Sequence, residues 1–178
     1  MYLLGNKEQE KVLRRKLPPV DFAREDKKEL KGLVKQMRAV MREANGVGLS
    51  ANQIGIHKRL FVAQVPDGQG HTKFYAVVNP EITKTSKDTA TLEEGCLSAP
   101  EHYGLVERPL RVTLQGFDTN GRKVKIKAWG LLARVFQHEV DHLDGKLFVD
   151  RVKEVRRVPT SPRLVAREEK IAREREGA

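Results

Sequence analysis

The pattern with the clearest chemical meaning is His138-Glu139-Val140-Asp141-His142. Two histidines four residues apart on a helix lie on one side, about a turn apart, so their imidazoles can share one metal ion. Glu139 stands beside the first histidine, close enough to move a proton of a metal-activated water. The competing interpretation is two surface histidines on a polar helix face. Leu131 and Val135 lie on the same side of that helix and argue against it.

Two histidines leave such a metal site short of a third protein ligand. The single cysteine, Cys96, lies upstream in Glu94-Gly95-Cys96-Leu97-Ser98, and thiolate is a soft ligand suited to zinc or ferrous iron. A free cysteine is more often a small core residue, but the two-histidine helix and the preceding glycine favour a ligand. A zinc peptidase of the thermolysin type would instead use a downstream glutamate; the candidates lie in polar, basic sequence: Glu154, Glu168, Glu169, Glu174 and Glu176.

A glycine-spaced segment, 46–55, is the third candidate for function. Its first six residues match the dinucleotide pattern G-x-G-x-x-A, but a helical pattern precedes them and no long helix follows before Phe61, so nucleotide binding is not predicted. We expect an extended segment whose backbone pairs with the backbone of a ligand, with Gln53 supplying an amide donor. The alternative is a purely structural bend.

Two helices are predicted to flank these segments. Apolar residues recur at helical spacing over 27–44, where Asp26 and Glu29 resemble a capping box and Asn45-Gly46 is a stop signal. The second helix, 130–145, carries both histidines and ends at Gly145.

Strands are predicted between the helices, at 60–65, 73–79, 110–118 and 122–128, with loops at 83–91 and a break at 155–162. The predicted fold is α+β: mostly antiparallel strands packed around a central helix carrying the two histidines, plus an N-terminal amphipathic helix and a variable C-terminal tail. A short amphipathic helix is predicted within that tail, at 163–178.

Length and composition favour one domain, 1–150, followed by a basic tail, 151–178. One cysteine excludes an internal disulfide framework, and no apolar run approaches the ~18 residues of a membrane span. The first residues lack the pattern of a secretory signal, so we expect a bacterial-type cytoplasmic protein.

The net charge of +10 lies mainly on the two ends of the chain. Residues 1–45 hold 12 Lys/Arg against 7 Asp/Glu, residues 46–150 hold 13 against 12, and residues 151–178 hold 9 against 5. Such basic flanks are either a solvated surface or attract a partner that contains nucleic acid. No pattern for reading a base sequence is present, so specific DNA binding is not predicted.

Three segments in order, GVGLSANQ (46–53), EGCLS (94–98) and QHEVDHLDG (137–145), resemble the signature motifs of the peptide deformylases. The likeness covers roughly residues 1–150. Ser50 departs from it, because the family usually has alanine there. The resemblance implies a metal-dependent hydrolase that removes the formyl group from the initiator methionine of new polypeptides. It implies three metal ligands, with water as the fourth: Cys96, His138 and His142.

The resemblance also implies roles for the residues around the metal. Glu139 takes a proton from water and delivers it to the leaving amine. The side-chain amide of Gln53 and the backbone N–H of Leu97 stabilise the negative formyl oxygen, and the backbone of Gly48 pairs with the substrate. The metal is expected to be ferrous iron, with zinc, nickel and cobalt as substitutes.

Helical spacing from His138 leads to a hypothesis about substrate selection: Leu131 and Val135 line an apolar pocket for the methionine side chain, with Arg134 at its rim. A carboxylate is expected to accept the other N–H of a bound histidine, and spacing leaves Glu94 and Asp141 as alternatives.

The expected partners are nascent formylated polypeptides. The basic flanks are compatible with docking on the ribosome surface, and no membrane partner is expected. Two other functions stay open at this point: a zinc metallopeptidase of the HExxH type and an inactive ribosome-binding homologue.

Overall fold

The computed structural model describes residues 1–66 and 71–158. Its helices are α1 (Lys7–Leu13), α2 (Lys27–Glu43) and α3 (Gly130–Leu143), with short 3₁₀ turns at Ala51–Ile54 and Phe148–Asp150. Its strands are β1 (Gly48–Ser50), β2 (Leu60–Pro66), β3 (Thr72–Thr85), β4 (Thr89–Cys96), β5 (Ala99–Pro109), β6 (Arg111–Phe117), β7 (Lys123–Trp129) and β8 (Arg156–Arg157). The prediction of an α+β fold is confirmed.

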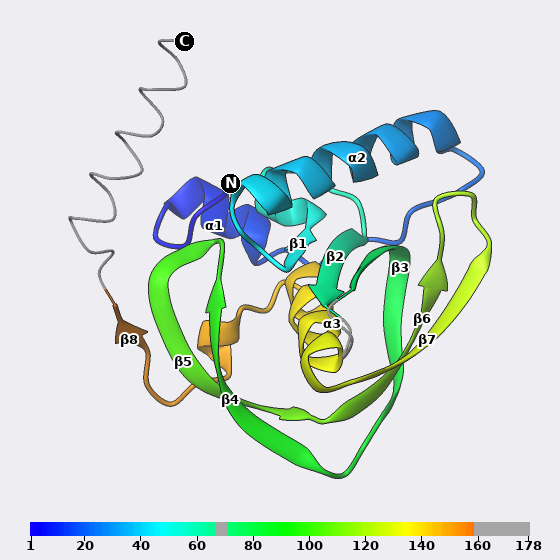
Figure 1. Ribbon diagram of the computed structural model, residues 1–178. Helices are drawn as coiled ribbons and strands as arrows, with labels where there is room; N and C mark the ends of the chain where they lie inside the picture. Colours follow the sequence, from blue (N-terminus) through cyan, green and yellow to red (C-terminus); the bar gives the residue numbers. More distant parts are fainter. Residues whose placement is uncertain (67–70, 159–178) are drawn as a thin grey trace, which may run out of the picture.

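The strands form two antiparallel sheets that surround α3 (Figure 1). One sheet has the order β1-β2-β3-β6-β7, and the other has the order β4-β5-β8. Phe136 and Val140 of α3 are buried in one cluster with Phe61, Val77 and Leu114 from the larger sheet. The helix with the two histidines is therefore held in the core, as the sequence predicted.

Strand β1 pairs with β2 and lies at the edge of the larger sheet. Helix α2 packs over it, burying Leu30, Met37 and Met41 in a second cluster with residues of β1 and β2. Local signals set the bounds of α2: the Asp26 carboxylate accepts a hydrogen bond from the Lys28 N–H at 2.7 Å, and the chain after α2 turns through a left-handed residue. The edge of β1 that faces away from β2 borders the pocket described below.

Glycine is required where α3 ends. Gly145 has a φ of 74°, and a Cβ there would lie 2.2 Å from the backbone oxygen of Arg14. This close approach packs the residues after α1 against the end of α3, where the Leu17 N–H donates to the Leu143 carbonyl.

The residues that precede α1 contact two segments of the site, one at Gln53 and one at Ser98. The Tyr2 N–H donates to the carbonyl of Gln53 at 2.6 Å, and the Leu4 N–H donates to the carbonyl of Ser98 at 2.7 Å. These two hydrogen bonds connect the segment after β1 with the turn after β4.

The predicted loop at 83–91 was wrong over most of its length, because β3 continues to Thr85 and β4 begins at Thr89. The stretch alternates polar residues with threonines, whose β-branched side chains suit an exposed strand. Helix α1 and strand β5 were not predicted, and the predicted break at 155–162 contains the short strand β8. The tail helix predicted at 163–178 lies outside the described residues. None of the helices within the described ranges is long and apolar enough to cross a membrane.

Candidate metal centre and substrate pocket

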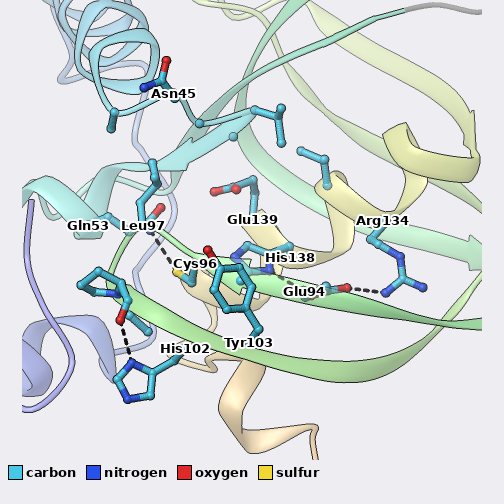
Figure 2. Close-up of a pocket in the computed structure, with 18 of the residues that line it drawn as sticks. Asn45, Gln53, Glu94, Cys96, Leu97, His102, Tyr103, Arg134, His138 and Glu139 are labelled. Atoms are coloured by element: carbon cyan, nitrogen blue, oxygen red, sulfur yellow. Dashed lines mark hydrogen bonds and ion pairs between the residues drawn. The ribbon is translucent and has the colours of Figure 1, made fainter. Parts of the chain in front are cut away.

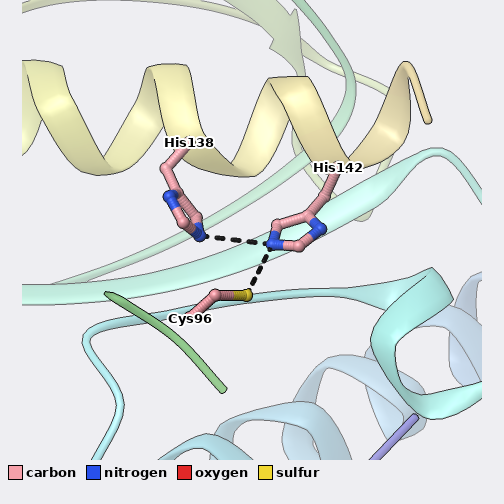
Figure 3. A group of neighbouring side chains, drawn as sticks. All are labelled: Cys96, His138 and His142. Atoms are coloured by element: carbon pink, nitrogen blue, oxygen red, sulfur yellow. Dashed lines mark hydrogen bonds between the residues drawn. The ribbon is translucent and has the colours of Figure 1, made fainter. Parts of the chain in front are cut away.

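The fold brings the single cysteine and the two histidines together. Cys96 ends β4, and His138 and His142 lie on consecutive turns of α3 (Figure 3). The His142 Nε2 atom lies 3.1 Å from the Cys96 sulfur and 3.2 Å from the His138 Nε2 atom. The donor atoms of the three residues all lie within 4.8 Å of one another. Two imidazole nitrogens and a sulfur thus converge on one point, as the ligands of a single ion do.

Electrostatics favour the metal-binding form of the sulfur. Burial would raise the pKa of the Cys96 thiol, but the two neighbouring imidazoles outweigh burial and hold that pKa well below its ordinary value. Burial would lower the pKa of His138, but hydrogen bonds with Cys96 and Glu94 raise it to about 10. The thiolate is therefore stabilised by the positive charge of the neighbouring imidazoles. A divalent cation that binds here displaces the imidazole proton and supplies the positive charge in its place. The donor set fits a soft or borderline divalent metal.

The structure shows which carboxylate supports His138. The Nδ1 atom of His138 lies 3.1 Å from Glu94 Oε2. Asp141 instead accepts hydrogen bonds from Arg108 and Arg151, at 2.7 and 2.6 Å. Glu94 is thus the residue that orients the first imidazole, leaving the Nε2 atom of that ring for the metal.

Arg108 joins the two carboxylates in the interior. Its guanidinium is 2% exposed and donates to both oxygens of Glu94, at 2.7 and 2.9 Å, and to Asp141. Arg134 donates to Glu94 as well, at 2.6 Å. Burial would raise the pKa of Glu94, but hydrogen bonds from His138 and Arg108 outweigh burial and lower it to about 2. The network keeps Glu94 ionised beside the metal ligands.

Glu139 is buried against β1. A Cβ added to Gly48 would lie 2.2 Å from Glu139 Oε1, so only glycine allows the strand to pass so close. On the other side, the Ser50 hydroxyl lies 2.7 Å from Glu139 Oε2. Burial raises the pKa of Glu139, opposed by the charges of the two histidines and by the Ser50 hydrogen bond. A buried carboxylate with a raised pKa is suited to accepting and releasing a proton.

Gln53 is held in a fixed orientation by its own turn. Its side-chain oxygen accepts from the Ser50 N–H at 2.8 Å, which leaves the amide NH₂ free to donate. That group lies 3.1 Å from the Ser98 hydroxyl and 3.5 Å from the Cys96 sulfur. The amide therefore points at the metal ligands. Leu97 lines the pocket. Its side chain occupies the space that a side chain at position 46 would need, so Gly46 allows this contact.

A pocket of about 670 Å³ opens onto these groups (Figure 2). The residues after α2, strand β1, the β4–β5 hairpin and one face of α3 line it. Leu131 and Val135 are among the lining residues, the first 53% exposed and the second buried. Arg134 also lines the pocket. It is buried, and its guanidinium donates to the carbonyls of Ala90 and Val106 as well as to Glu94.

Three further polar residues of the site were not singled out from the sequence: Arg108, Ser98 and Asn52. Asn52 is buried behind the centre and donates to the backbone carbonyl of His142 at 2.7 Å. Arg108 lies on the same buried face of β5 as Gly104 and Val106, at the two-residue spacing of a strand. A charged residue on a buried face implies a buried partner of opposite charge.

Comparison with known proteins agrees with the site. The family model for polypeptide deformylase matches residues 6–158. The peptide deformylase of Treponema pallidum is 48% identical over 129 residues, which are 72% of this chain and 76% of the relative. Among solved structures, the peptide deformylase of Thermotoga maritima has a TM-score of 0.76 at 38% identity, covering 86% of this chain and 97% of its own.

A second solved structure, the Met-Ala-Ser-bound class I type b peptide deformylase of Acinetobacter baumannii, has a TM-score of 0.76 at 35% identity, covering 85% of this chain and 96% of that chain. The family match extends over most of the chain, and the site brings a cysteine and two histidines together, with Cys96, His138 and the buried Glu139 lining one pocket. On both grounds, the chain belongs to the polypeptide deformylase family.

Proposed function

We propose that the protein hydrolyses the N-formyl group of the initiator methionine of newly made polypeptides, so that an N-formyl-Met-peptide and water give formate and a Met-peptide. The observation that carries the proposal is the meeting of Cys96, His138 and His142 beside a buried glutamate in an open pocket. Among the described residues the third donor is the upstream thiol and not a downstream glutamate, which argues against a thermolysin-type peptidase.

The three donor residues would hold one divalent metal, and we propose ferrous iron, with zinc, nickel or cobalt as substitutes. When bound, such a cation supplies Lewis acidity and makes water acidic enough to act as a nucleophile near neutral pH. The soft sulfur ligand supports iron or zinc over magnesium or calcium. If iron is the working metal, protein purified without oxygen and with reductant is more active than protein purified in air, because a thiolate–iron site is prone to oxidation.

Glu139 is proposed to carry the proton from water to the leaving nitrogen. The carboxylate accepts the proton as the water oxygen bonds to the formyl carbon, and it returns the proton to the amine as the carbon–nitrogen bond breaks. Its burial supports this role, because a raised pKa lets one group act first as a base and then as an acid.

The negative charge that develops on the formyl oxygen is proposed to be stabilised by the Gln53 amide and the Leu97 N–H. The orientation of the amide supports this, because the Ser50 N–H holds its oxygen and directs the NH₂ group to the metal ligands. Removing one such donor costs about 10²–10³ in turnover.

The substrate backbone is proposed to pair with β1 at Gly48. This strand is at the edge of its sheet and borders the pocket, so a peptide can extend the sheet by one strand. The methionine side chain is proposed to lie against Leu131 and Val135. A panel of formyl peptides tests the pocket: formyl-Met substrates should turn over faster than formyl-Asp substrates, and equal rates would rule the pocket out.

Two substitutions test the chemistry against formate release from a formyl-Met-Ala-Ser peptide. Glu139→Gln should keep the metal, measured by elemental analysis, and lose activity. Cys96→Ala should lose both the metal and the activity. If Glu139→Gln retained full activity, or if the wild-type protein cleaved casein but released no formate, the proposed function would be wrong.

Nascent chains are the proposed source of the substrate, in the bacterial-type cytoplasm. The exposed lysines of α2 support docking on the polyanionic ribosome surface: Lys27, Lys28, Lys31 and Lys35. We propose that residues 1–150 form the catalytic domain and that 151–178 act as a basic tail. Co-sedimentation with ribosomes that is unchanged after deletion of residues 159–178 would remove those residues from this role.

A further inference from the structure

Ser50 is the residue of β1 whose side chain faces the buried carboxyl group of Glu139. Its side chain is fully buried, and its hydroxyl oxygen lies close to two oxygens of one residue. One is Glu139 Oε2, at 2.7 Å, and the other is the backbone oxygen of Glu139, at 3.0 Å. Both distances are in the range of an O–H···O hydrogen bond.

We propose that Ser50 is a positioning residue for Glu139, and that its hydroxyl donates to Oε2 and so holds the carboxyl group in one orientation beside the metal ligands. The inference rests on the proposed function, because Glu139 is the group assigned there to carry the proton.

A serine hydroxyl has one hydrogen, which it can donate to the carboxylate oxygen it faces. The contact to Oε2 is the shorter of the two, and it holds that oxygen against β1. The other carboxylate oxygen, Oε1, lies against Gly48.

The surroundings leave the carboxyl group little other freedom. Gly48 contacts Oε1 so closely that a Cβ there would lie 2.2 Å away, and Ser50 lies against Oε2. Both residues belong to β1, whose pairing with β2 fixes them relative to the core. The strand that is proposed to bind the substrate backbone thus also orients the group that moves the proton, and alanine at position 50 would lack the contact to Oε2.

Kinetics on the metal-loaded enzyme test the inference. Ser50→Ala should fold, because alanine removes only the hydroxyl of a small buried side chain, and it should lower kcat about three- to tenfold, the effect of losing one ordinary hydrogen bond, with KM unchanged. Ser50→Thr keeps the hydroxyl and should restore kcat. Ser86→Ala, in the exposed turn between β3 and β4, is the control and should change neither constant. An unchanged kcat in Ser50→Ala would overturn the inference, and so would an increase in KM alone.

A double-mutant cycle shows whether the hydroxyl acts through Glu139. In a Glu139→Ala background, Ser50→Ala should leave the residual rate unchanged, whereas the same loss in both backgrounds would contradict a role through the carboxyl group.

The same four proteins give a measurement that needs no turnover. In urea unfolding, Ser50→Ala should raise the unfolding equilibrium constant about three- to tenfold more in the wild-type background than in the Glu139→Ala background. Additive effects would overturn the contact itself. If the wild-type protein released no formate while this coupling was present, the proposed function would fail but the Ser50–Glu139 contact would stand.

Discussion

Replacing Arg108 by methionine is the strongest test of how the interior supports the metal centre. The guanidinium is 2% exposed and makes three hydrogen bonds to Glu94 and Asp141, both of which are buried. Methionine fills a similar space but leaves two buried carboxylates without their shared cation. Removing one partner from a buried ionic network costs about 3–5 kcal/mol, a large share of the roughly 5–15 kcal/mol that stabilises a typical domain.

The chain offers a matched control for this substitution. Arg111, three residues away, also pairs with an aspartate, Asp88, but both side chains are more than 60% exposed. An exposed pair contributes at most about 1 kcal/mol, so Arg111→Met should cost far less than Arg108→Met. The measurement is the free energy of unfolding in urea at pH 7, at one fixed metal concentration. Equal losses in the two variants would refute the assigned role of the buried network.

The same comparison has a predicted pH dependence. Burial would raise the pKa of both carboxyls, but the hydrogen-bonded cations hold the pKa of Glu94 at about 2 and the pKa of Asp141 below its ordinary value. The network therefore stabilises the protein fully above the unfolded-state values of 4.5 and 3.8, and this contribution is lost as the pH falls toward 2. The difference in stability between wild type and Arg108→Met should be full at pH 7 and shrink below about pH 4. A difference that grew on acidification would contradict this sign.

Two further substitutions probe the groups closest to the reaction. Glu94→Gln should weaken metal binding about 10- to 100-fold, measured by competition with a chelating dye, because His138 loses the carboxylate that orients its ring; an unchanged affinity would show that the ring is oriented by other contacts. Gly48→Ala should lower kcat/KM sharply in the formate assay, because the new Cβ would lie 2.2 Å from Glu139 Oε1, and a fully active variant would mean that β1 can move away at little cost.

The elements that hold the chemistry could be predicted from local patterns. Helix α3 was found because its apolar residues, its histidine spacing and its terminal Gly145 all indicate one helix, and the structure places it in the core. Strands β6 and β7 were found because Asn120-Gly121 gives a strong turn signal between alternating residues. The three donor residues were identified because two histidines lie four residues apart on that helix and the chain has a single cysteine, in a motif that resembles the family's.

What could not be predicted depends on contacts between segments far apart in the sequence. The choice of Glu94 over Asp141 is made by where β4 and β5 lie against α3, and spacing along the chain contains no information about that. Spacing placed Arg134 beside the predicted pocket, but it contains no information about the carbonyls of β4 and β5 that accept hydrogen bonds from its guanidinium. Helix α1 was missed because a seven-residue helix is held by packing and its Asn6 cap more than by its own sequence.

The hydrogen bonds from Tyr2 and Leu4 have a practical consequence for anyone preparing this enzyme. They connect the start of the chain to the backbone of Gln53 and Ser98, so the first few residues are part of the wall behind the active site. A purification tag fused before Met1, or removal of the first residues by an aminopeptidase, would disturb the hydrogen bonds to the segments that carry Gln53 and Cys96. Batches that differ in their first residues should differ in activity even when their metal content is the same.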